Sequence, residues 1–132
     1  MSIFNSLFGS SAEKKEIMAT VNWIPLTDLE QLNEIVALSN EKPIVIFKHS
    51  TRCSVSRMAL KQFENEFDVE RLHGNVALYF LDLLEHRAIS NEIATRFGVY
   101  HQSPQLLLIK NGKSVYDVSH DAIDAEELKG KL

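Results

Sequence analysis

The sequence of 132 residues contains a single cysteine, Cys53. One chain therefore cannot form an internal disulfide, and it cannot build a metal site from several cysteines. Any redox reaction of Cys53 needs a partner sulfur from another molecule. A secreted scaffold held together by disulfides is excluded, and we expect no metal site and no tightly bound cofactor.

Long apolar runs and an excess of basic residues are also missing. No run approaches the roughly 18 apolar residues that a membrane span requires, and the first ten residues lack the features of a secretory signal. Fourteen basic residues stand against eighteen acidic ones, for a net charge of −4. Nucleic-acid binders need excess Lys and Arg to displace counterions from phosphate. We expect a cytoplasmic protein with no nucleic-acid partner and no membrane association.

The length predicts one domain, since domains commonly span roughly 100 to 200 residues. Residues 1–20 differ from the rest, because a short apolar group at helical spacing precedes a run of charges. We interpret them as an N-terminal tail, with a short amphipathic helix as the alternative. Residues 21–132 are predicted to form a single domain.

Apolar spacing predicts a helix and then a buried strand at the start of this domain. Thr27 followed by Glu30 is a capping-box signature, and Asn40 marks the predicted helix end. The apolar face of this helix is expected to comprise Leu29, Leu32, Ile35 and Val36. The β-branched run at residues 43–47 predicts a buried strand, and residues 21–24 are a candidate for an additional short one.

Helices and strands keep alternating along the rest of the chain. The helix that follows Cys53 is expected to bury Met58, Ala59, Phe63 and Phe67. The next predicted elements are a second strand at 76–84, a helix ending at Gly98 and a third strand at 105–109. An Asn111–Gly112 hairpin then returns the chain through 115–118, and a helix at 124–132 follows. The predicted fold class is α/β, a central mixed sheet of four to five strands with helices on both faces.

Cys53 follows the first buried strand and begins a helix. The first turn of a helix presents unpaired N–H groups and the positive end of the helix dipole, and both favour a thiolate. Arg52 and Arg57 add positive potential, and His49 would do so if protonated.

Ser56 lies one helical turn after Cys53, where its hydroxyl is expected to donate a hydrogen bond to the sulfur. A lone cysteine is commonly a small buried hydrophobe. The polar residues around it, from His49 to Ser56, favour a reactive thiol instead.

Pro104 is a second signal, because it precedes a buried strand and follows Gln102 and Ser103. A proline at this position is allowed with either a cis or a trans bond, and the spacing does not choose between them. His101 and His120 either border the same cleft or are turn residues.

The string KHSTRCSVS at residues 48–56 and the string HQSPQ at residues 101–105 resemble a known family. With Asn111–Gly112 and Ser119–His120 in this order, residues 22–132 resemble the thioredoxin-like superfamily and, within it, the monothiol bacilliredoxin family of the YtxJ or BrxC type. The resemblance implies a thioredoxin-like fold. The family usually has Pro and Ile where this chain has Ser54 and Val55.

The resemblance also implies roles for individual residues. Cys53 matches the nucleophilic cysteine, and Ser56 stands where dithiol relatives keep a resolving cysteine. Pro104 matches a cis-proline that faces the thiol, and Ser103 before it would offer backbone groups to an extended substrate. Substrate contacts are expected at His49, Thr51, Arg52, Ser103 and Pro104.

The implied activity is removal of bacillithiol from S-bacillithiolated client proteins. Bacillithiol would act as the thiol co-substrate, an external low-molecular-weight thiol would resolve the adduct on Cys53, and the protein would be a monomer or weak dimer. Two alternatives remain open. One is a redox-silent client-binding or stress protein of the same fold. The other is a carrier of an iron–sulfur cluster bridged between two chains, as in some monothiol glutaredoxins.

Overall fold

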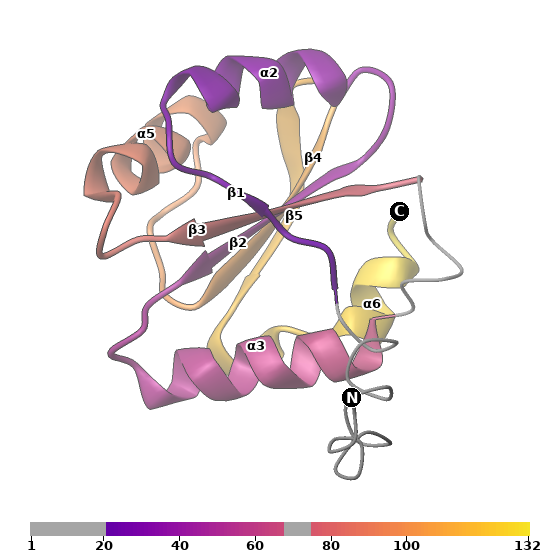
Figure 1. The fold of residues 1–132 in the computed structure, drawn as a ribbon. Coiled ribbons are helices and arrows are strands. Elements are labelled where there is room, and N and C mark those ends of the chain that lie inside the picture. Colours follow the sequence, from indigo (N-terminus) through magenta and orange to yellow (C-terminus); the bar gives the residue numbers. More distant parts are fainter. Residues whose placement is uncertain (1–20, 68–74) are drawn as a thin grey trace, which may run out of the picture.

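The computed structural model describes residues 21–67 and 75–132, which form a sheet with helices on both faces (Figure 1). The five strands lie in the order β1-β3-β2-β4-β5. The strands are β1 (Ile24–Pro25), β2 (Ile44–His49), β3 (Ala77–Asp82), β4 (Gln105–Lys110) and β5 (Lys113–Ser119). The helices are α2 (Glu30–Leu38), α3 (Ser54–Glu66), α5 (Arg87–Phe97) and α6 (Ala125–Lys129), with a 3-10 turn at His120–Ala122. The predicted tail at residues 1–20 lies outside the described residues.

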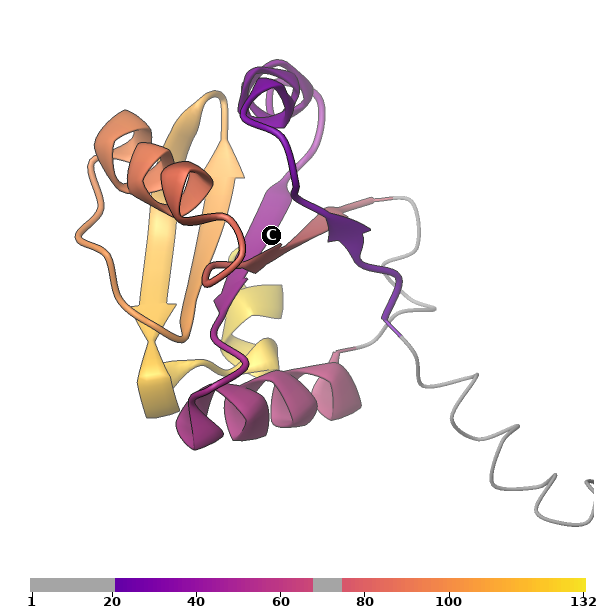
Figure 2. The same cartoon turned by 60° about the vertical axis from the view of Figure 1, so that its left-hand side comes forward.

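The sheet is mixed, as predicted. β3 pairs in parallel with β1 and β2, whereas β4 is antiparallel to both β2 and β5. Figures 1 and 2 show α2 and α5 on one face and α3 and α6 on the other. Within the described residues, no helix is long and apolar enough to cross a membrane.

The central strand β2 contributes to two separate cores. Ile46 packs with the apolar side chains of α2 and α5, and Phe47 packs with those of α3 and α6. Both side chains are fully buried. A strand covered on both faces needs a continuous apolar run, which explains the sequence of residues 43–47.

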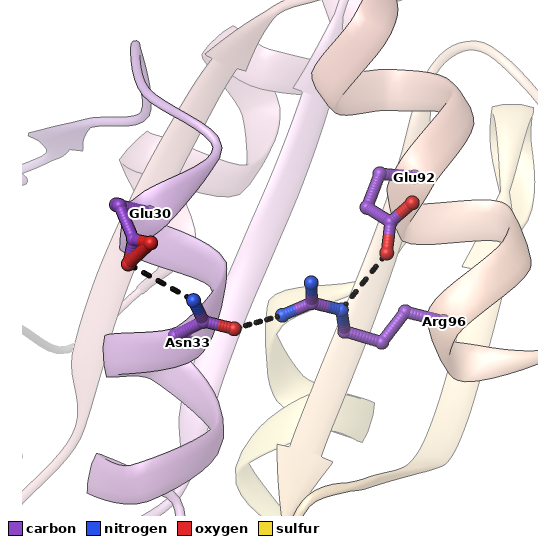
Figure 3. Close-up of polar contacts among 4 residues, drawn as sticks. All are labelled: Glu30, Asn33, Glu92 and Arg96. Atoms are coloured by element: carbon purple, nitrogen blue, oxygen red, sulfur yellow. Dashed lines mark hydrogen bonds and ion pairs between the residues drawn. The ribbon is translucent and has the colours of Figure 1, made fainter.

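Polar side chains join the two helices that cover the first face (Figure 3). Arg96 of α5 donates from Nη1 to Oδ1 of Asn33 in α2, at 2.9 Å, and pairs through Nε with Glu92 at 3.1 Å. Asn33 donates in turn to Glu30 at 2.9 Å. These groups are partly or fully exposed, so we expect them to orient the helices more than to stabilise the fold.

The start of α2 differs from the prediction. The side-chain oxygen of Gln31 accepts hydrogen bonds from the backbone N–H groups of Thr27 (2.7 Å) and Asp28 (3.0 Å). Asp28 Oδ1 accepts from the N–H of Glu30 at 2.9 Å. The Thr27–Glu30 capping box is therefore wrong, because the helix begins at Glu30 and Thr27 lies too far ahead of its first turn.

Two apolar placements were also wrong, and one strand is shifted. Met58 is 71% exposed and Leu29 is 47% exposed. Met58 lies on the outer side of α3 because Ala59 and Phe63, four residues apart, define the inner side. The candidate extra strand is present, but it is Ile24–Pro25 and overlaps residues 21–24 only at Ile24.

The predicted turns are confirmed. Asn111 and Gly112 have φ values of 51° and 77°, as a tight hairpin between β4 and β5 requires. Gly98 ends α5 in the left-handed conformation, with a φ of 66°. The last helix is shorter than predicted, and Asp124 caps it by accepting from two backbone N–H groups.

Candidate active site

Cys53 follows β2, as predicted, and occupies the N-cap position of α3. Its backbone N–H donates to the carbonyl of Ser50 at 3.2 Å, and its carbonyl accepts from the N–H of Arg57 at 3.1 Å. The residue is partly exposed. The thiol is therefore held at a helix N-terminus, where the backbone dipoles favour a negative charge.

The Ser56 hydroxyl does not donate a hydrogen bond to the Cys53 sulfur, contrary to the prediction. Ser56 is fully buried, accepts from the N–H of Ser50 at 3.1 Å, and lies 2.8 Å from Nδ1 of His49. A buried hydroxyl needs an acceptor for its hydrogen, and among the described residues that acceptor is His49 Nδ1. The helical turn directs this side chain inward, beneath the site.

His49 is buried below the thiol rather than exposed to substrate. Only 5% of its surface is exposed, and its ring packs against Phe80 at 5.4 Å between centroids. Burial lowers the pKa of His49, and the positive charge of Arg57 lowers it further, against opposing effects of Asp82 and Glu64. The imidazole is therefore neutral at pH 7. Its electrostatic help to the thiolate was predicted on the condition of protonation, and the lowered pKa disfavours the protonated form.

Thr51 and Arg52, two of the residues expected to contact substrate, are exposed. Arg57 is exposed one turn further on, and its Nη1 donates to the carbonyl of Thr51 at 3.0 Å. No ion pair among the described residues involves either arginine. Both guanidinium groups can thus attract an anion near the thiol.

The Ser103–Pro104 peptide bond is cis, as the family resemblance implied. The register pairs Lys48 of β2 with Gln105 of β4, which places Pro104 at the same sheet edge as the segment leading to Cys53. The carbonyl of Pro104 accepts from the N–H of His120 at 3.0 Å. The Ser103 hydroxyl oxygen is buried and has no partner in the described part of the chain.

A buried lysine lies at the end of β2, and the sequence analysis gave it no role. Lys48 is fully buried, and its Nζ lies 2.9 Å from Nδ1 of His101. Burial lowers the pKa of Lys48 to about 8. The sequence signal was a charged side chain at an inward position of an otherwise apolar strand.

An apolar recess lies beside the first turns of α3. Val55 and Met58 are 46% and 71% exposed there. The recess has a volume of about 280 Å³ and is lined by Val55, Met58, Ala59, Gln62, His120, Asp121 and Ile123. A cavity of this size accepts a side chain or a small ligand group beside the cysteine helix.

The chemistry open to this site is disulfide exchange with another molecule. One thiol is present in the chain, and the Ser56 hydroxyl one turn further along α3 is bonded to His49. No cluster of three or more His, Cys, Asp or Glu side chains suited to a metal lies within residues 21–67 and 75–132. A thiol at a helix N-terminus beside a cis-proline segment defines a thioredoxin-fold oxidoreductase of the monothiol type.

Comparisons with known proteins agree with this class. The model of the family "Monothiol bacilliredoxin BrxC" matches residues 24–128, and the chain belongs to this family. A solved structure described as a candidate oxidoreductase with a thioredoxin fold is 31% identical, with a TM-score of 0.68, covering 81% of this chain and 90% of that one. The thioredoxin of Malassezia sympodialis (20% identity, TM-score 0.62, covering 83% and 87%) and that of Fasciola hepatica (18%, 0.60, 81% and 93%) share the fold.

Proposed function

We propose that this protein removes bacillithiol from client proteins that carry it as a mixed disulfide. The observation that carries the proposal is a single thiol at the N-terminus of α3, with the buried Ser56 hydroxyl bonded to His49 in the place of a second thiol. Membership of the monothiol bacilliredoxin family supports it.

The reaction proceeds in two exchanges at one sulfur. The Cys53 thiolate attacks the bacillithiol sulfur of the mixed disulfide, a new disulfide forms, and the client sulfur leaves as a thiolate that takes a proton from water. A second bacillithiol, as its thiolate, then attacks the bound bacillithiol sulfur. Bacillithiol disulfide leaves, and the Cys53 thiolate is restored.

Residues around the thiol bind and orient the reactants. The helix N-terminus and the two exposed arginines, Arg52 and Arg57, attract anionic groups of the small thiol. The Ser103–Pro104 segment receives the client as an extended chain, through the backbone groups of Ser103. The recess beside Val55 and Met58 takes an apolar client side chain.

The test is the intact mass of the protein after exposure to bacillithiol disulfide, with glutathione disulfide in a parallel sample. We expect one bacillithiol adduct, formed faster than the glutathione adduct, removed by free bacillithiol and absent from Cys53→Ser. Absence of any adduct at neutral pH would contradict the proposal and favour a redox-silent client-binding protein. A coloured dimer after anaerobic purification would favour the iron–sulfur carrier.

A further inference from the structure

Lys48 places a buried positive charge at the edge of the sheet that bears the site. Its side chain is fully buried within β2, and none of the ion pairs between described residues includes it. Burying an ammonium group without a carboxylate is costly. An apolar side chain at this position would stabilise the fold more than a buried ammonium group does.

The partner of Lys48 is His101, in the segment between α5 and β4. An ammonium group only donates, so Nδ1 of His101 must accept and the ring proton lies on Nε2. Burial lowers the pKa of His101, and the charges of Lys48 and Arg87 lower it further. The ring therefore stays neutral at pH 7 and keeps its acceptor. The Ser90 hydroxyl of α5 approaches the same nitrogen at 3.3 Å.

A second bond fastens the same segment to the sheet. Gln105, which pairs with Lys48 across β2 and β4, donates from Nε2 to the carbonyl of Tyr100 at 2.9 Å. Lys48 and Gln105 therefore hold two adjacent residues, Tyr100 and His101, that come just before Ser103 and Pro104. The two sequence strings that marked the family, one containing Cys53 and the other containing Pro104, are joined directly by the Lys48–His101 bond.

We propose that the Lys48–His101 bond positions the Ser103–Pro104 segment for client binding, which makes both residues positioning residues for the protein mixed disulfide. This inference rests on the proposed function. The bond fixes where the backbone groups of Ser103 lie relative to Cys53, so its loss should weaken client binding while leaving the thiol itself reactive.

The experiment compares Lys48→Met and His101→Leu, which remove the donor and the acceptor, with His101→Asn, whose side-chain oxygen can still accept near the Nδ1 position. Lys113→Met, an exposed lysine at the far end of β5, is the matched control. Each variant is first checked for folding by circular dichroism and thermal unfolding. Steady-state reduction of a bacillithiolated protein then gives KM and kcat, and alkylation by iodoacetamide reports the thiol alone.

We expect KM for the protein substrate to rise about tenfold in Lys48→Met and His101→Leu, the effect of losing one hydrogen bond to a charged group. The value of kcat and the alkylation rate should change less than about twofold. His101→Asn should recover most of the affinity, and Lys113→Met should match the wild type. An unchanged KM in folded variants would overturn the inference, as would an equally large fall in the alkylation rate.

Amide hydrogen exchange separates this inference from the proposed function. If the bond positions the segment, the amides of Gln102, Ser103 and Gln105 should exchange at least several-fold faster in Lys48→Met, whether or not the wild type acts on bacillithiol. If exchange is faster in Lys48→Met but the wild type does not act on bacillithiol, the proposed function is contradicted and the positioning role is supported. Unchanged exchange would sink the positioning role on its own.

Discussion

At the scale of single residues, Ser56 is the key difference from a dithiol site, because it places a hydroxyl where a second thiol would resolve an adduct on Cys53. It occupies the position one turn after Cys53 and points to His49 rather than to the sulfur. The neutral His49 imidazole thus lies beside the atom that would be a second sulfur if Ser56 were cysteine. Because Ser56 and His49 are both buried, their polar atoms need hydrogen-bond partners inside the protein.

Ser56→Cys is expected to convert the chain into a dithiol protein. Residues three apart on a helix are neighbours, so Cys53 and the introduced thiol should form a disulfide, and a bacillithiol adduct on Cys53 should be expelled without added thiol. Intact mass and free-thiol counts measure this, with Cys53→Ser combined with Ser56→Cys as control. A stable adduct and no internal disulfide would contradict the expectation.

Ser56→Ala should lower the free energy of unfolding by about 2 kcal/mol, since it leaves the buried N–H of Ser50 and Nδ1 of His49 without a partner. Urea unfolding measures the change. Ser54→Ala, at an exposed site in the same helix, should stay within about 0.5 kcal/mol. Equal losses in the two variants would show that the Ser56–His49 hydrogen bond does not stabilise the fold.

The lowered pKa of Lys48 predicts that the free energy of unfolding rises with pH. Its pKa is about 8 in the folded chain against 10.5 for the free group. The unfolded chain therefore binds more protons between these values, and the free energy of unfolding should rise by up to about 3 kcal/mol as pH increases through this window. Urea unfolding at pH 8 and pH 10 tests this, and Lys48→Met should lack the rise. Above pH 10, the raised pKa values of Tyr79 and Tyr116 act in the opposite direction.

At the scale of elements, the sequence predicted what depends on local spacing. The strand run at 43–47, the hairpin at Asn111–Gly112 and the left-handed Gly98 follow from burial and backbone sterics over a few residues. The start of α2 was misplaced by one residue, because Gln31 rather than Glu30 accepts from the backbone N–H groups of Thr27 and Asp28. Met58 was misplaced because apolar character alone does not tell which side of a helix is covered.

Gly98→Ala tests the end of α5 in isolation. The φ of 66° disfavours an L side chain, and an added Cβ would meet no heavy atom within 4 Å. The expected loss is therefore backbone strain alone, about 1 kcal/mol in the free energy of unfolding. Gly130→Ala is the control, because its φ of −69° suits alanine and the loss there should be under about 0.5 kcal/mol. Thermal or urea unfolding decides between them.

At the scale of the molecule, the site combines segments far apart in the chain. The sequence predicted Cys53 at a helix start, and the family resemblance implied the cis bond before Pro104. The Lys48–His101 bond was beyond reach, because it joins residues 53 positions apart and depends on how β2 and β4 pair. The inward orientation of Ser56 likewise depends on the register of α3 against the sheet.

The single sulfur has a kinetic consequence for any disulfide exchange that this chain performs. Both half-reactions use the same atom, so the first product must leave before the second thiol can react, and no complex holding both substrates forms on the path. Double-reciprocal plots at different thiol concentrations should then be parallel, a ping-pong pattern. When the second thiol becomes scarce, the chain accumulates in its modified form, and the modified fraction reports the balance between oxidised clients and thiol supply.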